Sequence, residues 1–331
     1  MAFLLDPWSA ERPQLGSEDS GDAEEQGAEV ELLEALRAKP AEPIPAGFGD
    51  LYVVDGSRRL EARLLEERPD GLHFAGLGQF GVGAVRLGGE GKPAAELTGL
   101  RTERRLLLSG ELSSWQEREF CLPAGPGGSG ACTYLALPGA ENQPEGASQK
   151  LQAEMLQAEM ELAERLAEQS PGALILLDGP LRGQASQRRV LGYVKSQRTQ
   201  YLRGAQAALL SELQPGERTP LMRLHYRYQA SRLSWYVRLA SPRPYQDPRS
   251  GLIRLEAFAP ETGELAGWVR ELASYGGTLL GKLASRPHQD QRAPQNLLPT
   301  GALERAIARR MGDARLIYRR IQRRLFQEAA S

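Results

Sequence analysis

Short runs of consecutive large apolar residues, each followed by a turn signal, are the strongest feature of the hydrophobic pattern. Residues 174–177 and residues 51–54 form two such runs, and each predicts a strand that is buried on both faces. Each run is followed by an aspartate and a glycine, at Asp178 and at Asp55. A single Asp-Gly pair is ordinary turn chemistry. Because the pair occurs twice in the same setting, we interpret it as two buried strands that each carry a carboxylate at the C-terminal end.

Alternating and helical periodicities elsewhere predict a mixed α/β chain. The further predicted strands are residues 60–65, 71–76, 101–108, 117–122, 190–195, two strands between 221 and 239, and 252–258. The predicted helices are residues 29–39, 149–168, 204–214, 264–285 with a break near Gly276, and 301–326. An acid-bearing strand is thus followed by antiparallel strands, a helix and a second acid-bearing strand. This is the chain order of a ribonuclease-H-like fold, which predicts a mixed sheet flanked by helices, with extra strands and helices inserted.

The composition of the 331 residues is that of a globular chain and excludes several classes of protein. Hydrophobic residues make up 41%, charged residues 25%, and the mean hydropathy is −0.43. No apolar run approaches the ~20 residues that span a bilayer, and the N-terminus has no signal-peptide pattern, so we expect a cytoplasmic protein without a membrane segment. Cys121 and Cys132 are too few for a disulfide framework or a four-ligand zinc site, and two buried thiols are the favoured interpretation. The chain has no phosphate-loop motif, so we do not expect it to hydrolyse ATP itself.

Charge is distributed unevenly, although the formal net charge is only −1. Residues 17–34 hold many acidic residues and no Lys or Arg, which predicts a flexible acidic arm with a short helix at residues 1–45. Residues 46–331 then form one domain that ends in the basic helix 301–326. Such a helix is a solvated face, a phosphate-binding surface or a docking element for an acidic partner, and charge alone does not decide among these.

Two strand-end aspartates and a nearby helix glutamate predict a metal site. Carboxylates that cluster without a counter-charge are costly, so they usually bind a divalent cation. Two such ions roughly 4 Å apart hold the attacking water and the leaving oxygen of a phosphodiester. The helix before the second acid-bearing strand offers a third acid, and Glu161 borders its apolar stripe. The competing acids on the same helix, which periodicity does not exclude, are Glu154, Glu159 and Glu164.

Three short motifs together resemble the NurA nuclease family, over about residues 48–315. They are Asp55-Gly56-Ser57 after a strand, Leu177-Asp178-Gly179-Pro180-Leu181, and Gly192-Tyr193-Val194-Lys195-Ser196. The resemblance implies a ribonuclease-H-like fold and a manganese-dependent exonuclease and endonuclease, with 5′-to-3′ polarity, that processes DNA ends during double-strand break repair. It also implies a homodimer that works with HerA, a hexameric DNA-translocating ATPase.

Carried over by position, the resemblance assigns the family's metal-binding acids to Asp55 and Asp178, and its helix acid to Glu161, with Mn²⁺ or Mg²⁺ as the cofactor. The family also has a Tyr and a His shortly before the last helix, and this sequence has no matching arrangement there. His288 and Asp290 are the available substitutes for the last ligand or general base.

Candidate DNA contacts lie on several segments. Lys195 either contacts a phosphate, as the resemblance suggests, or is an ordinary strand-end lysine, and Arg292 is a further candidate. Arg223, Arg227 and Arg232 are interleaved with aromatic residues, a pattern typical of surfaces that bind single- or double-stranded nucleic acid. A half-exposed strand without any nucleic acid gives the same pattern, and we slightly favour that interpretation.

The sequence therefore predicts a metal-dependent DNA nuclease. The alternative is a non-catalytic DNA-binding or ATPase-adaptor protein on the same fold, and an enzyme that acts on RNA is not excluded, because nothing in the sequence recognises a 2′-hydroxyl.

Overall fold

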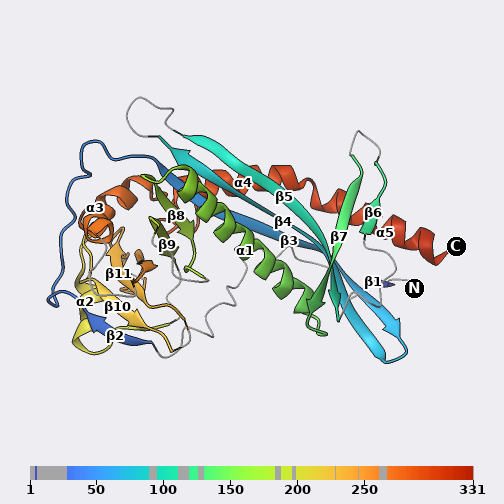
Figure 1. The fold of residues 1–331 in the computed structure, drawn as a ribbon, viewed down its shortest axis with the longest axis horizontal. Coiled ribbons are helices and arrows are strands. Elements are labelled where there is room, and N and C mark those ends of the chain that lie inside the picture. The colour runs from blue at the N-terminus through green and yellow to red at the C-terminus, as the bar shows by residue number, and fades with distance from the viewer. Residues whose placement is uncertain are drawn as a thin grey trace.

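The computed structural model describes residues 4–5, 28–88, 95–110, 119–125, 130–182, 188–195, 199–227, 229–244, 246–260 and 267–330. One mixed sheet of 12 strands forms the centre of the molecule, and helices pack on both of its faces (Figure 1). The strands are β1 (Leu4–Leu5), β2 (Glu29–Leu32), β3 (Leu51–Arg68), β4 (Gly71–Leu87), β5 (Glu96–Ser109), β6 (Glu119–Leu122), β7 (Cys132–Ala140), β8 (Leu174–Asp178), β9 (Val190–Val194), β10 (Met222–His225), β11 (Arg232–Arg238) and β12 (Leu252–Phe258). The helices are α1 (Gly146–Gln169), α2 (Ala205–Glu212), α3 (Gly267–Leu283), α4 (Leu298–Met311) and α5 (Ala314–Ala329).

The sheet has the order β2-β10-β11-β12-β9-β8-β3-β4-β5-β7-β6, and β1 pairs with β3. Strands β3, β4 and β5 form an antiparallel meander. The chain then reaches β8 by way of β6, β7 and α1, and β8 and β9 run parallel to β3. This confirms the predicted succession of meander, helix and second acid-bearing strand in a mixed α/β fold.

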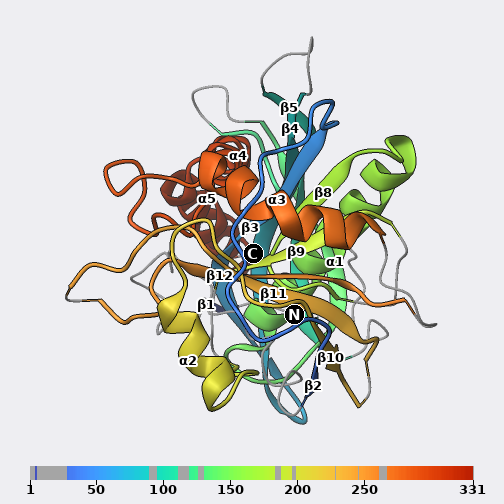
Figure 2. The same ribbon diagram turned by 90° about the vertical axis from the view of Figure 1, so that its left-hand side faces the viewer.

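The two faces of the sheet are covered by different helices. On β3, Tyr52 and Val54 point to the face that packs against α1, whereas Leu51 and Val53 point to the opposite face, against α3. Helix α4 lies on the same face as α3, because its Leu303 and Ile307 pack on β4. Figure 2 shows α4 and α5 on one side of β3 and β4 and α1 on the other.

Glycines on β4 allow the helices to come close to the sheet. A methyl group on Gly81 would lie 2.5 Å from Cγ2 of Ile307 on α4. On the other face, a methyl group on Gly78 would lie 2.6 Å from a methyl carbon of Leu151 on α1. These positions have room only for hydrogen, and we infer that glycine there sets the distance between sheet and helices.

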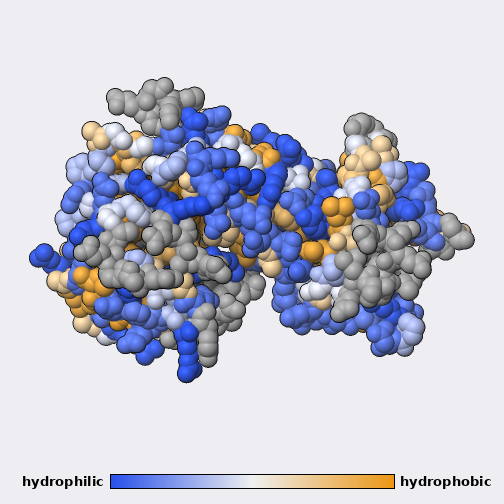
Figure 3. Space-filling view, in the orientation of Figure 1, coloured by the Kyte–Doolittle hydropathy of each residue, from blue (hydrophilic) through white to orange (hydrophobic). Residues whose placement is uncertain are grey.

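The β3–β4 hairpin extends well beyond α1 and forms the scaffold of a second, smaller lobe (Figure 1). Its apolar residues pack with β5, β6 and β7 and with Ile317, Ile321 and Leu325 of α5. Figure 3 shows that the face turned to the viewer is mostly hydrophilic over both lobes, with scattered hydrophobic residues. None of the described helices is long and apolar enough to span a membrane.

Two helix predictions were wrong. The segment 29–39 begins with strand β2, because Val30 and Leu32 alternate with Glu29 and Glu31 and contact the cluster under β10. Instead of one helix over 301–326, the chain forms α4 and α5 with a break at Gly312, whose φ is 81°. Asp313 then starts α5 by accepting a hydrogen bond from the Leu316 backbone N–H at 2.8 Å. Most of the predicted flexible arm lies outside the described residues.

Three smaller differences concern helix α3 and strands β7 and β3. Helix α3 continues through Gly276 and Gly277 without the predicted break, because the absence of a side chain at Gly277 lets the helix lie against the backbone of Gly216. Strand β7 was not predicted. Strand β3 does not end at Asp55 but continues to Arg68, paired with β4 throughout, so the Asp55-Gly56 pair is not a turn.

Candidate active site

Asp55 and Asp178 come together at the rim of the sheet. Strands β3 and β8 are parallel neighbours whose last register pair is Val54 with Leu177, so the next residue on each strand is an aspartate. Alternation along the strands places both side chains on the face that carries α3 and α4. Strand β8 ends here, and Gly179, with a φ of 120°, directs the chain toward β9. The two carboxylates therefore lie where β8 ends and β3 continues without β8 beside it.

Asp55 is in an environment that does not favour its negative charge. Its side chain is buried, Oδ1 accepts a hydrogen bond from the Gly56 backbone N–H at 2.9 Å, and Oδ2 has no hydrogen-bond partner within the described part of the chain. Burial raises the pKa of Asp55 well above its ordinary value, and the charge of Asp178 raises it further, while Lys195 acts in the opposite direction. A buried carboxylate with one unsatisfied oxygen beside a second carboxylate is a site to which a cation is attracted.

Lys195 follows β9 and lies between two elements of the site. Its ammonium donates to Oδ2 of Asp178 and, at 2.8 Å, to Oδ1 of Asn296. Asn296 is fully buried, and its backbone carbonyl accepts from the Ser285 N–H at 2.9 Å. The side chain of Asn296 therefore fixes the position of the ammonium relative to Asp178.

The segment before α4 completes this polar network. Nδ2 of Asn296 donates to Oδ2 of Asp290 at 2.5 Å, and Asp290 also accepts from the Arg292 backbone N–H at 2.7 Å. Although burial opposes ionisation, the hydrogen bonds from Asn296 and Arg292 hold the pKa of Asp290 below its ordinary value. Arg292 in turn forms a 2.8 Å ion pair with Glu304 of α4, whose charge contributes to the raised pKa of Asp55.

Tyr193 forms the floor of the site on β9. It is in register with Asp178, and its hydroxyl donates to the Gln295 carbonyl at 2.8 Å. Burial raises the pKa of this phenol well above its ordinary value, and the charge of Asp178 acts in the same direction. Tyr193 therefore stays neutral and ties the sheet to the segment that covers it.

The helix acid predicted at Glu161 does not lie at the site. The side chain of Glu161 is 53% exposed and pairs with Arg101 at 3.4 Å. Glu159, one of the three alternatives, is only 2% exposed, and its carboxylate lies against Gly56, the residue after Asp55. Helix α1 covers the face of the sheet opposite to the Asp55 side chain, and Glu159 meets strand β3 from that face, one residue after Asp55.

The predicted candidates near α4 separate into two groups. Lys195, Asp290 and Arg292 belong to the network just described. His288 is exposed, and within the described part of the chain its ring makes no hydrogen bond or ion pair. The structure thus brings Asp290, but not His288, to the cluster.

The aromatic and arginine residues of strand β11 lie in the interior of the protein. Arg232, Trp235 and Tyr236 are buried, and Arg232 lies 4.5 Å from the ring centre of Phe258. The structural interpretation of this pattern is therefore the correct one for these three residues, because β11 is an interior strand.

Arg223 and Arg227 lie on and just after β10, which is separated from β8 by three strands. At ~4.8 Å per strand, β10 lies roughly 19 Å from β8 across the sheet. The structure does not bring either residue to the site.

The donor set fits a divalent cation in chemistry, although the ligands are not gathered as a finished centre. Carboxylate oxygens are the ligands preferred by Mg²⁺ and related hard cations, and Asp55 offers an unsatisfied one. Among the described residues, no three His, Cys, Asp or Glu side chains already form a group that could hold a metal ion. At Asp178, the positive charge that pairs with the carboxylate is the ammonium of Lys195.

Sequence reasoning missed Asn296 and Glu304. Asn296 lies two residues before the start of α4, in a segment with no recognisable motif. Glu304 is a single acid in a helix that is otherwise basic. No local pattern marks either residue, since their roles depend on the packing of α4 against the sheet.

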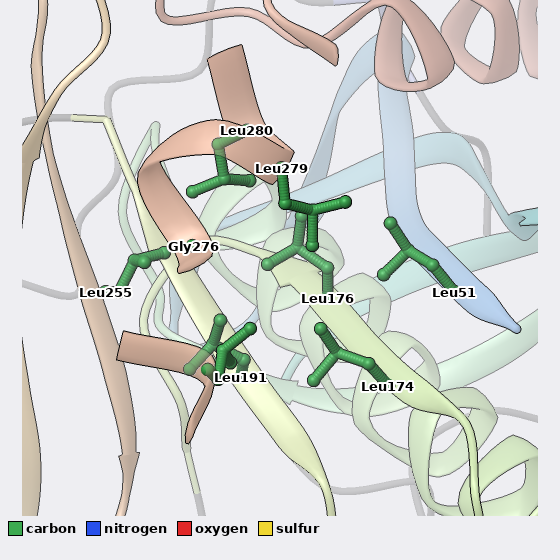
Figure 4. Close-up of a pocket in the computed structure, with 9 residues that line it drawn as sticks. Leu51, Leu174, Leu176, Leu191, Leu255, Gly276, Leu279 and Leu280 are labelled. Atoms are coloured by element: carbon green, nitrogen blue, oxygen red, sulfur yellow. The ribbon is translucent and has the colours of Figure 1, made fainter. Parts of the chain in front are cut away.

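The apolar cavity in Figure 4 is a packing feature and not a reaction site. Helix α3 and the sheet enclose it, and the described residues that line it are eight leucines and Gly276.

Comparisons with known proteins give one family. A model described as the NurA domain matches residues 49–306, which include Asp55, Asp178 and Asn296. Among solved structures, the crystal structure of the NurA nuclease from Sulfolobus solfataricus is similar, with 12% sequence identity and a TM-score of 0.46 over 87% of this chain and 88% of that chain. A comparison with curated proteins found no match.

Proposed function

This chain belongs to the NurA domain family, and on that premise we propose that it is a nuclease that hydrolyses phosphodiester bonds of DNA. The observation that supports the proposal best is the pair Asp55 and Asp178 on adjacent parallel strands, where one buried oxygen of Asp55 has no hydrogen-bond partner in the described segments. The strand order β5-β4-β3-β8-β9, with β8 and β9 parallel to β3, supports a ribonuclease-H-like core.

The cofactor in this proposal is Mn²⁺ or Mg²⁺. Asp55 and Asp178 would hold it, with Glu159 rather than Glu161 as the third acid. When bound, a divalent cation supplies Lewis-acid stabilisation of the charge that develops on a phosphodiester under attack by water.

The other polar residues position the substrate. The Lys195 ammonium, held by Asn296, is placed to pair with a phosphate oxygen once a cation neutralises Asp178. Arg292 lies beside it and offers a guanidinium for the adjacent phosphate, while Glu304 holds that guanidinium in place. The depressed pKa of Asp290 keeps it ionised, so its role is to orient Asn296 and Arg292.

The substrate and partners are part of the same proposal. We propose single- and double-stranded DNA ends as substrates, a homodimer as the assembly, and a HerA-type translocating ATPase as the partner in double-strand break repair. These are expectations from family membership.

The proposal is tested by degradation of end-labelled linear DNA in the presence of Mn²⁺. Asp55→Asn and Asp178→Asn should each lower the rate by at least about a hundredfold, because each removes a cation ligand that is worth several kcal/mol. Glu159→Gln should also lose activity. Glu161→Gln is the matched control from the same helix and should keep it.

One observation favours the adaptor alternative, namely that Lys195 already neutralises Asp178. If the wild-type chain is inactive with Mn²⁺, both alone and together with the ATPase and ATP, the adaptor interpretation replaces the nuclease. Activity that persists in both aspartate variants, with folding intact, would place the active site elsewhere.

A further inference from the structure

The C-terminal helices carry a row of exposed arginines that the proposed site does not use. We call this row the arginine stripe and define it as Arg305 and Arg309 of α4 with Arg315, Arg319 and Arg323 of α5. Within each helix the members are four residues apart, so their side chains emerge on one side.

Both helices turn this side away from the protein. Ile307 of α4 packs on β4, and Ile321 of α5 packs on the extended part of the same sheet. Figure 2 places the two helices on one face of the sheet. The stripe therefore forms one solvent-facing surface across both helices.

The acids near the stripe are engaged elsewhere. Glu304 pairs with Arg292 at 2.8 Å and Glu328 pairs with Arg324 at 2.7 Å, while Asp313 caps α5. Within the part of the chain that the structure describes, the guanidinium groups of the stripe make no ion pair or hydrogen bond. The positive charge of this surface is thus uncompensated.

Hydrogen bonds between side chains and backbone carbonyls hold the helices that carry the stripe. At the end of α4, the Met311 carbonyl accepts from Gln79 at 2.9 Å and the Gly312 carbonyl accepts from Arg59 at 3.1 Å. Arg320 anchors α5 by donating to the carbonyls of Pro123 at 2.6 Å and Gly130 at 2.8 Å. A rigidly placed row of charges costs little to order on binding.

The stripe begins at the candidate active site. A methyl group on Gly301 would lie 3.5 Å from Nη1 of Arg305 and 3.9 Å from both Asn296 Nδ2 and Asp290 Oδ2. The first arginine is therefore next to the polar network that covers Asp178, and the others lead away from it toward the smaller lobe.

We propose that the arginine stripe binds the phosphate backbone of duplex DNA and directs the end of the duplex to the Asp55–Asp178 site. At ~1.5 Å per helical residue the stripe is roughly 27 Å long, which corresponds to about eight base pairs at ~3.4 Å each. A row of cations held by two consecutive helices fits a rod-like duplex. Surfaces for single strands instead rely on aromatic stacking, and among the described residues of α4 and α5 the one exposed aromatic side chain is Phe326. The direction toward the site rests on the proposed function, whereas binding does not.

Equilibrium binding of a fluorescent 20-base-pair duplex, measured by anisotropy in EDTA, tests the proposal without any cleavage. The test variant combines Arg309→Gln, Arg315→Gln, Arg319→Gln and Arg323→Gln. At 100 mM salt we expect its affinity to fall at least about tenfold, and the slope of log K against log salt to decrease by about 3 to 4, because each lost phosphate contact removes ~0.9.

A matched control removes the same charge from exposed arginines elsewhere, by Arg37→Gln, Arg165→Gln, Arg203→Gln and Arg270→Gln. This control variant should bind the duplex within about threefold of the wild-type affinity, and its salt slope should differ from that of the wild type by less than about one unit. Replacement of the four stripe arginines by lysine should also retain the slope, since lysine meets phosphate as a point charge. Circular dichroism and melting confirm that the variants fold.

Several results would overturn the proposal. The first two are an unchanged duplex affinity of the stripe variant and an equal loss of affinity in the control variant. A third is stripe-dependent binding that is tighter for a 20-nucleotide single strand than for the duplex. A fourth is a stripe variant whose oligomeric mass in light scattering changes while its DNA affinity does not. Because the assay contains no metal, stripe-dependent binding stands even if the chain cleaves nothing. Conversely, if the chain cleaves DNA but the stripe variant binds the duplex as well as the wild type does, the proposed nuclease function stands and the arginine-stripe proposal is wrong.

Discussion

Two aspartates with the same sequence context are held in different ways. Asp178 ends β8, and its charge is met by Lys195. Asp55 is in the middle of β3 and has a buried oxygen that finds no hydrogen-bond partner among the described residues. The Asp-Gly pair predicted a strand end correctly in one case and wrongly in the other, because β3 is stabilised past Asp55 by its pairing with β4.

At the same scale, Glu34 connects the N-terminal segment to the sheet. It accepts hydrogen bonds from Arg218 at 2.6 Å, from the Leu221 N–H at 2.7 Å and from Lys39 at 2.8 Å. Burial opposes the ionisation of Glu34, but these donors prevail and lower its pKa from 4.5 to about 2.

We expect Glu34→Gln to lower the free energy of unfolding by about 2 kcal/mol at pH 7, after allowance for solvent screening. The folded pKa is depressed, so this stability is present above pH 4.5 and is lost as the pH falls from 4.5 toward 2. Urea denaturation of wild type and variant between pH 7 and pH 3.5 should show the difference shrinking. Glu31→Gln, whose side chain is 55% exposed, is the control, and a gap that is independent of pH would contradict the prediction.

At the scale of elements, the site depends on how closely α4 approaches the sheet. Leu303 and Ile307 reach β4 only because Gly83 and Gly81 have no side chains. This approach carries Glu304 and the Asn296 segment to Asp55 and Asp178. Amphipathic periodicity predicted a basic helix here, but it did not predict the break at Gly312 or the strand that the helix covers.

Gly81→Ala is expected to destabilise the protein by about 1 to 3 kcal/mol, because the new methyl group overlaps Ile307. Chemical denaturation measures the loss, and the end-labelled DNA assay should show reduced cleavage as α4 shifts. Gly172→Ala is the control, since nothing lies within 4 Å of its added methyl group. Combining Gly81→Ala with Ile307→Ala should cost less than the sum of the two single changes. Simple additivity would show that this contact does not hold α4.

At the scale of the whole molecule, the candidate site is assembled from three distant parts of the chain. Strand β3, the β8–β9 pair and the segment that leads into α4 meet at the rim of one sheet. A cation bound between them would therefore stabilise the folded chain as a whole.

Addition of Mn²⁺ at about a hundredfold excess over its dissociation constant should stabilise the wild type by about 2.7 kcal/mol, which is several degrees of melting temperature. Asp55→Asn should abolish this shift. Because burial and Asp178 raise the pKa of Asp55, its ionised form costs stability at neutral pH, so the metal-free variant should melt no lower than the wild type. An equal Mn²⁺ shift in the variant would exclude Asp55 as a ligand.

Local sequence determined the central elements of the fold. Consecutive apolar residues define β8 and the start of β3, and helical spacing defines α1. Asp55 and Asp178 could be identified as candidates because each directly follows one of these apolar runs. These features depend on neighbours within a few residues, which is the range over which periodicity carries information.

Only the tertiary structure decided which residues share the site. It buried Glu159 against the sheet at Gly56 and left the side chain of Glu161 53% exposed. It brought Asn296 to Lys195, which lies 101 positions earlier in the sequence, and it buried Arg232 between the rings of Tyr226 and Phe258. Such choices depend on which faces pack together, and packing joins residues whose separation leaves no trace in the local pattern.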